Sequence, residues 1–250
     1  MRFISVLMLL LALAVSGCAG KAKSENALEG RYILALSHLA NNDPTSALNV
    51  LIPVVEANPR KVEYQEALAY AFFLKKAYPE AERHYLKALR LSTDGSQSAQ
   101  IENNLGSLYL EMRRWDEALV HFRSAASSLV FQTPEVALSG IGTVYLQRGQ
   151  YIEAVEAYRD ALRRNPNYSP AYFKLAEAYR LLAKPELAVE TYEKLMVLRP
   201  NSAQIHYQLG MTWLEMKRAK EAKQAFEAVL KYGSGTELGD RASENLRLLK

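Results

Sequence analysis

The sequence predicts an all-α, right-handed superhelical solenoid, and three observations lead to that prediction. Small residues recur about every 34 residues along the 250-residue chain. In every interval an Ala follows the first small residue by 12 positions, and a bulky apolar residue follows that Ala by 4. Apolar residues spaced by three or four lie on one face of a helix. Each interval therefore encodes two helices that meet where their small residues allow close approach.

Six intervals share this pattern and define six predicted repeats. The residue sets are Ala35/Ala47/Leu51, Ala69/Ala81/Tyr85, Gly106/Ala118/Phe122, Gly142/Ala154/Tyr158, Ala176/Ala188/Tyr192 and Gly210/Ala222/Phe226. The repeats span 28–61, 62–95, 99–132, 135–168, 169–202 and 203–236. This period and helix pairing are those of the tetratricopeptide (TPR) repeat.

A final helix is expected at 237–250, after the helix-breaking Gly233 and Gly235. Its apolar residues recur at helical spacing and should lie on one side; they are Leu238, Ala242, Leu246 and Leu249. A stack of repeats leaves an apolar end that needs a cap. We expect this helix to be the C-terminal capping helix.

Residues 1–17 are predicted to be a secretory signal peptide. Arg2 precedes an apolar run from Phe3 to Val15, and small residues follow. At ~1.5 Å per residue this run is too short to cross a hydrocarbon core of ~30 Å. A cleaved leader is therefore favoured over a membrane span.

Cys18, the single Cys of the chain, follows this leader directly. The stretch Val15-Ser16-Gly17-Cys18 resembles the lipobox of bacterial lipoproteins. The resemblance implies cleavage before Cys18, a covalent lipid on that residue and a lipid-anchored tether over 18–27. Because Ala19 is not Asp, the resemblance implies the periplasmic face of the outer membrane rather than the inner membrane. The alternative is an incidental thiol.

Composition argues against nucleic-acid binding. The formal net charge of +4 is spread along the chain, with no run of five or more like charges. A nucleic-acid site needs clustered Lys and Arg.

The sequence predicts no enzyme, no metal site and no cofactor beyond the lipid. His84 and His121 occupy equivalent positions of two repeats, too far apart to share a metal with ligands at ~2.0–2.1 Å. The chain contains no HExxH, no Gly-rich phosphate loop and no nucleophile elbow.

The remaining function is protein binding through the concave groove that the first helices of the repeats would line. The period projects apolar and aromatic residues onto this groove, and such an exposed surface usually marks a binding site. The predicted partner-binding residues are Tyr32, Leu36, Tyr70, Phe73, Asn103, Leu110, Leu146, Phe173, Leu181, Tyr207 and Met211. Either an extended peptide or an amphipathic helix could occupy the groove.

Several features together resemble the PilF/PilW-like pilotins, outer-membrane lipoproteins of type IV pilus biogenesis. The features are the lipobox, six repeats, the stretch from Ala81 to Leu89, Asn103-Asn104 before Gly106, and Phe131-x-Thr133-Pro134 before the fourth repeat. The resemblance implies a client that is an outer-membrane secretin. It also implies delivery of the secretin to the membrane and assembly into a ring.

Two other functions stay open at the sequence level. A general periplasmic envelope scaffold, for peptidoglycan enzymes or another secretion complex, would need the same anchor and the same groove. A hydrolase would need a cleft with paired acid and base groups, which the sequence does not indicate.

Overall fold

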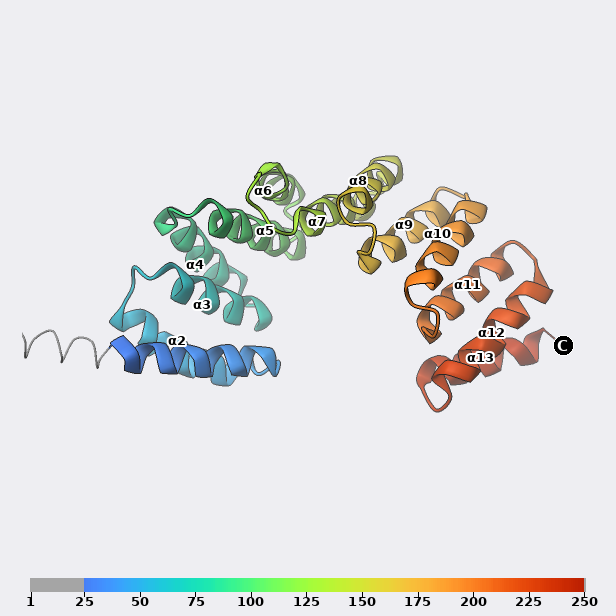
Figure 1. The fold of residues 1–250 in the computed structure, drawn as a ribbon, viewed down its shortest axis with the longest axis horizontal. Helices are drawn as coiled ribbons and strands as arrows, with labels where there is room; N and C mark the ends of the chain where they lie inside the picture. The colour runs from blue at the N-terminus through green and yellow to red at the C-terminus, as the bar shows by residue number, and fades with distance from the viewer. Residues whose placement is uncertain (1–24, 250) are drawn as a thin grey trace, which may run out of the picture. The chain divides into compact units, whose positions relative to one another are not determined.

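The computed structural model describes residues 25–249. The predicted signal peptide, Cys18 and the tether up to residue 24 lie outside the described residues. Every regular element among residues 25–249 is a helix (Figure 1). The chain divides into two compact units. The first unit ends at Leu108, and the second begins at Tyr109.

The first unit opens with a helix at residues 25–40. It continues with α2 (Pro44–Ala57), α3 (Val62–Leu74) and α4 (Tyr78–Leu91), and it includes most of α5 (Gly95–Glu111). Its core contains Ala35, Ala47, Leu51 and Leu68, all of which are buried. The small residues and Leu51 predicted to pack in the first repeat therefore do so.

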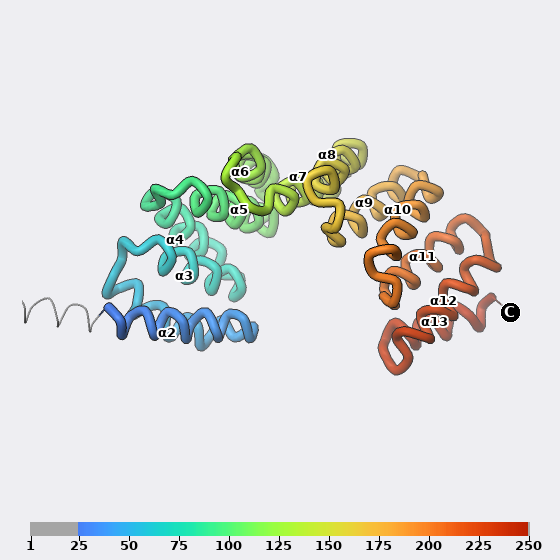
Figure 2. The backbone as a smooth tube through the Cα atoms, viewed as in Figure 1, coloured from blue at the N-terminus to red at the C-terminus, as the bar shows by residue number. Residues whose placement is uncertain are grey.

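The second unit contains the remaining helices, and Figure 2 traces the chain as it turns back after each of them. They are α6 (Trp115–Ser127), α7 (Pro134–Gln147), α8 (Tyr151–Arg164), α9 (Ser169–Leu181), α10 (Pro185–Leu198), α11 (Ala203–Glu215), α12 (Ala219–Gly233) and α13 (Glu237–Leu248). Successive helices pack on one another from α6 to α13. Within residues 25–249, every helix falls short of the length and apolar character that a membrane crossing needs.

Glycines allow an aromatic ring of the neighbouring helix to lie directly on the backbone. A Cβ at Gly142 would lie 2.6 Å from Tyr158 Cε1, and a Cβ at Gly210 would lie 2.8 Å from Phe226 Cε1. Both aromatic side chains are fully buried. The structure thus confirms the predicted contacts within these two repeats.

Gly140, to which the repeat period assigns no packing role, makes a similar contact between repeats. A Cβ at Gly140 would lie 2.6 Å from Phe122 Cε1, which belongs to the preceding helix α6. On α7, therefore, Gly142 faces α8 while Gly140 faces α6. Two glycines, two positions apart, let one helix pack closely on both neighbours.

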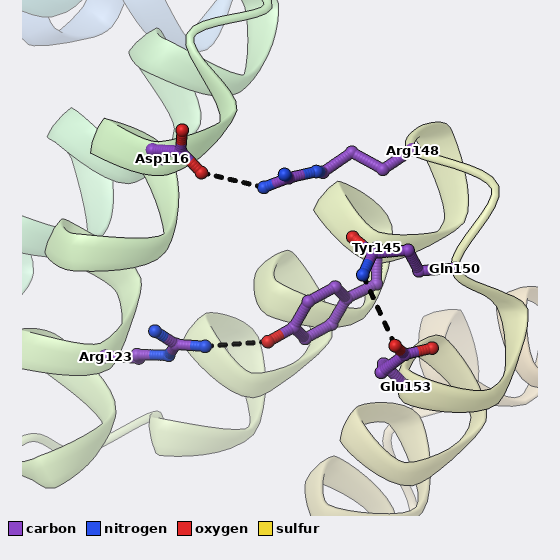
Figure 3. A network of polar contacts seen from close by, with 6 residues as sticks. All are labelled: Asp116, Arg123, Tyr145, Arg148, Gln150 and Glu153. Carbon is purple, nitrogen blue, oxygen red and sulfur yellow. Dashed lines mark hydrogen bonds and ion pairs between the residues drawn. The ribbon is translucent and has the colours of Figure 1, made fainter.

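Exposed polar contacts also link α6 and α7 (Figure 3). Arg148 Nη1 lies 2.8 Å from Asp116 Oδ1, and Arg123 Nη2 donates to the Tyr145 hydroxyl over 2.7 Å. Asp116 is almost fully exposed, and exposed ion pairs contribute only ~0–1 kcal/mol. The buried contact of Gly140 with Phe122 is therefore the stronger determinant of this junction.

The turn inside each helix pair has one conformation throughout the described residues. One residue per turn has a positive φ of between 54° and 74°; these are Asn42, Lys76, Arg113, Gly149, Ala183 and Lys217. The next residue donates its N–H to the carbonyl five positions earlier, as Lys184 does to Tyr179 over 2.9 Å. This is the Schellman ending of a helix, in which a left-handed residue stops the helix and satisfies its last carbonyls.

The predicted capping helix is α13, which ends at Leu248. Thr236 is its N-cap, because its Oγ1 accepts a hydrogen bond from Gly239 N over 3.2 Å. Ala242 is fully buried, and Leu238 and Leu246 pack on the same apolar cluster as Phe226. The helix thus covers the apolar end of the last repeat, as expected.

Candidate partner-binding site

A hollow of about 380 Å³ lies on the first unit and is here called the N-terminal hollow. Three helices line it, namely the helix at 25–40, α3 and α5, which are the first helices of the first three repeats. The lining residues are Tyr32, Leu36, Leu39, Glu63, Glu66, Ala67, Tyr70, Gln100 and Asn104. On α3 they follow the i, i+3, i+4, i+7 spacing of a single helix face.

One wall of the N-terminal hollow is apolar and open to solvent. Leu36 is 40% exposed and Tyr70 is 41% exposed. Tyr32 packs on Tyr64, and their ring centroids lie 4.9 Å apart. Phe73 stacks on Tyr70 at 6.3 Å between centroids and so supports this wall from the side. Aromatic rings fixed in this way offer contact area at a low entropic cost.

The hollow also contains two acidic residues, Glu63 and Glu66, on the same face of α3 as Tyr70. Asn104 Nδ2 donates to Glu66 Oε1 over 3.1 Å, and Gln100 Nε2 donates to Asn104 Oδ1 over 3.1 Å. These partners are neutral amides, and no ion pair within residues 25–249 reaches Glu63 or Glu66. Among residues 25–249, no Lys or Arg lines the hollow.

The pKa values in the hollow reflect this negative charge. Burial and then the nearby Glu63 carboxylate raise the pKa of Glu66 above its usual range. Burial, followed by Glu66 and other carboxylates, raises the pKa of Tyr32 to about 12. The hollow therefore combines apolar surface with carboxylates to which no residue in the described part of the chain supplies a positive partner.

A second hollow, of about 400 Å³, lies on the second unit and is here called the C-terminal hollow. Its lining residues are Phe173, Lys174, Glu177, Arg180, Tyr192, Gln204 and Gln208. Gln204 and Gln208 of the sixth repeat occupy the positions of Gln100 and Asn104 in the third. Both hollows therefore use equivalent positions of the solenoid.

The chemistry of the two hollows differs. In the C-terminal hollow, Lys174 Nζ lies 3.0 Å from Glu177 Oε2, and Arg180 Nε donates to Glu215 over 2.9 Å. The hydrogen bond that Arg180 donates to Glu215 is also the first cause of a raised pKa of Arg180. The charges of the C-terminal hollow are thus paired within the protein, whereas the carboxylates of the N-terminal hollow have no cation beside them among the described residues.

The structure brings some of the predicted partner-binding residues together. Tyr32, Leu36 and Tyr70 line the N-terminal hollow, with Phe73 beside them. Phe173 lines the C-terminal hollow, and Leu181 is 50% exposed. Leu110 is half-buried and lines neither hollow.

Other predicted residues are packing positions. Asn103, Leu146 and Tyr207 are buried, and Met211 packs against the cluster around Phe226. They offer little surface to a partner, because packing within the protein covers their side chains. Asn103 is only 6% exposed, and its Oδ1 has no hydrogen-bond donor among the described residues.

Sequence reasoning missed four lining residues of the N-terminal hollow, which are Glu63, Ala67, Gln100 and Asn104. Their signal was their place on the helix face of the predicted aromatic residues. Glu63 lies two turns before Tyr70 on α3, while Gln100 and Asn104 lie one turn apart on α5.

The histidines at equivalent repeat positions are packing residues. His84 stacks on Phe72 at 5.6 Å, and His121 stacks on Tyr109 at 5.1 Å between ring centroids. Burial is the first cause that lowers the pKa of His84, whose Nδ1 lies 2.7 Å from Gln65 Oε1. Within residues 25–249, no group of three or more His, Cys, Asp or Glu is placed to hold a metal.

Known proteins share this fold and this repeat. Five family models, described as tetratricopeptide or TPR repeats, match residues 32–96, 99–128, 142–182, 170–202 and 203–232. The solved structure of PilW, described as a widely conserved type IV pilus biogenesis factor, aligns with a TM-score of 0.74 at 19% identity. The alignment covers 89% of this chain and 98% of PilW.

Several curated relatives match most of the chain. It is 26% identical over 220 residues to anaphase-promoting complex subunit 3 of Schizosaccharomyces pombe, but the match spans only 32% of that protein's length. It is 25% identical over 182 residues to the type IV pilus assembly protein PilF of Pseudomonas aeruginosa, covering 69% of this chain and 71% of PilF. The repeat matches, the packed small residues and the recurring helix pairs together show that this chain is a tetratricopeptide-repeat protein.

Proposed function

We propose that this protein is an outer-membrane lipoprotein adaptor that binds a protein client through its N-terminal hollow. Its client is a secretin, and it acts as a pilotin in type IV pilus biogenesis. The observation that carries this proposal is the similarity to PilF, which extends over 71% of that protein. The likeness in fold to PilW over nearly the whole of that chain is consistent with it.

The apolar wall of Tyr32, Leu36 and Tyr70, in which Leu36 and Tyr70 are exposed, supports a binding role. Such a wall gains free energy when a client covers it, at roughly 25 cal/mol per Å² of apolar surface removed from water. A bound secretin subunit would in turn have its own apolar surface shielded until it assembles.

The lipid proposed on Cys18 supplies the second part of the mechanism. Two or more acyl chains give durable membrane anchoring. An anchored adaptor raises the effective concentration of its client at the membrane without any new contact with the client. Binding and anchoring together would favour secretin assembly at the outer membrane over assembly elsewhere.

The test is co-purification from detergent-solubilised envelopes, with bound proteins identified by mass spectrometry. The wild type is compared with Tyr70→Glu/Phe73→Glu, which places two charges in the apolar wall. The matched control is Ile152→Glu/Val197→Glu, because both residues are exposed and lie outside the two hollows. SDS-resistant secretin multimers are measured in the same cells.

We expect the wild type and the control to recover secretin and to support normal multimer levels. The Tyr70→Glu/Phe73→Glu variant should lose both. Recovery of peptidoglycan enzymes or of another secretion complex, with no secretin, would contradict the pilotin role and favour the general envelope scaffold. Equal recovery of secretin by all three proteins would exclude the N-terminal hollow as the client site.

A further inference from the structure

We propose that the N-terminal hollow selects a client segment in which a positively charged side chain lies beside an aromatic or aliphatic anchor. This inference rests on the proposed function, which makes the hollow the client site. It adds the chemistry of the segment, and it restricts the range of clients that the apolar wall could accept.

The first step of the argument is the uncompensated charge of the hollow. Glu63 and Glu66 lie one turn apart on α3, and no cation among residues 25–249 pairs with either of them. Like carboxylates at this spacing destabilise each other. The Asn104 amide satisfies one Glu66 oxygen but neutralises no charge.

The second step is the comparison between the two hollows. At equivalent repeat positions the C-terminal hollow contains Lys174 and Arg180, each paired with a carboxylate. The corresponding residues of the second repeat are Ala67, which lines the N-terminal hollow, and Phe73, which lies beside it. The solenoid can therefore place cations at these positions, and in the second repeat apolar residues stand there instead.

The third step is desolvation. A client that covers the apolar wall also removes water from Glu66, which is already partly buried. Burying an unpaired charge is unfavourable, and a hydrogen-bonded opposite charge offsets that cost. A Lys or Arg in the client supplies this opposite charge. Its cationic group can also lie against the ring face of Tyr32 or Tyr70. A Glu or Asp at the same place would be repelled, which gives specificity as well as affinity.

The test begins with a library of random 12-residue peptides displayed on phage. The bait is the full-length protein in detergent micelles, and the Tyr70→Glu/Phe73→Glu protein removes peptides that bind elsewhere. We expect the selected peptides to be enriched in Lys or Arg next to Phe, Tyr, Trp or Leu. Peptides without such enrichment, or no peptide that depends on the wild-type hollow, would overturn the proposal.

The best selected peptide is then synthesised with its native cation, with Gln and with Glu at that position. Its Kd is measured by fluorescence anisotropy on wild type and on Glu63→Gln/Glu66→Gln. The double substitution should weaken binding of the cationic peptide by about tenfold and leave the Gln peptide nearly unchanged. Glu63→Lys/Glu66→Lys should restore binding of the Glu peptide, which a merely misfolded variant could not do.

The matched control is Glu56→Gln/Glu80→Gln, which makes the same change in net charge on the first unit outside the hollow. It should bind like the wild type. An equal loss in this control would show that net charge, rather than the hollow, attracts the peptide. Secretin recovery that needs Tyr70 and Phe73 but not Glu63 and Glu66 would overturn this inference while the proposed function stands.

Discussion

At the scale of single residues, close packing is the main determinant of this fold. Gly142 and Tyr158 illustrate it, because the space that a Cβ would need is already filled by the Tyr158 ring. Protein interiors are packed like organic crystals, so a ring in such a site cannot move aside without loss elsewhere.

The substitution Gly142→Leu is therefore expected to destabilise the second unit. Overpacking of this kind costs about 1–3 kcal/mol, which urea unfolding followed by circular dichroism can measure. Gly30→Leu is the control, since no atom lies within 4 Å of a Cβ at that helical position. Equal unfolding free energies for the two variants would contradict the packing assignment.

Glu66 is a second residue whose effect can be predicted, here with pH. Its pKa is raised in the folded state by burial and then by Glu63. A raised carboxyl pKa means that the folded state binds the proton more tightly than the unfolded state. The ionised residue therefore lowers stability above the folded-state pKa, and this penalty disappears below the unfolded-state pKa.

We expect Glu66→Gln to have a higher Tm than the wild type at pH 7 and the same Tm near pH 4. Thermal unfolding at the two pH values measures the difference. Because the same substitution should weaken cationic-peptide binding, it would trade binding for stability, as many functional-site residues do. A lower Tm at pH 7 would mean that Glu66 stabilises the fold and is not held in place for binding.

At the scale of elements, the turn within each helix pair is the recurring device. Five of the six described turns place a residue other than Gly at positive φ, where a Cβ is strained. The Schellman hydrogen bonds and the packing of the flanking helices hold that conformation. The turn is thus set by the helices it joins rather than by its own sequence.

Substituting Gly at such a turn should relieve the strain. Ala183 has a φ of 54°, so we expect Ala183→Gly to raise the free energy of unfolding by about 0.5–1 kcal/mol. Gly149→Ala is the reciprocal variant and should lower it similarly, since open space surrounds that site and only conformation changes. Chemical denaturation of both variants tests this. Shifts of the same sign would show that φ is not the cause.

The Pro residues of the sequence mark several helix ends that the structure contains. Helices α2, α8 and α10 end at Ala57, Arg164 and Leu198, each two residues before a Pro of the sequence, namely Pro59, Pro166 and Pro200. The first turn of α10 begins at Pro185, where a missing N–H costs nothing. Pro53 lies within α2, which nevertheless continues to Ala57, because packing of Leu51 and Val54 holds the helix together.

At the scale of the whole molecule, a lipid on Cys18 would confine both units to a membrane surface. We expect Cys18→Ala to release the protein into the soluble periplasmic fraction with its helical content unchanged. Cell fractionation with immunoblotting locates the variant, and circular dichroism checks the fold. A Cys18→Ala protein that still sediments with the outer membrane would exclude the lipid as the main tether.

The sequence by itself determined the repeat, the paired helices and the capping helix. The spacing of Gly210, Ala222 and Phe226 fixes which residues meet, because helix geometry relates positions along one chain without any knowledge of its neighbours. The period therefore predicted the buried contacts within repeats, such as that of Gly210 with Phe226.

Only the tertiary structure decided which residues of the first helices stay exposed. Asn103 and Tyr70 were projected onto one groove, yet Asn103 is buried and Tyr70 is open, because exposure depends on how closely the next helix packs. The tertiary structure also decides which polar or charged groups lie beside a given carboxylate. Whether Glu66 has a cation or an amide beside it depends on α5, which is 38 residues away along the chain at the Asn104 contact. Side-chain neighbours across helices come from packing, which a repeat period does not specify.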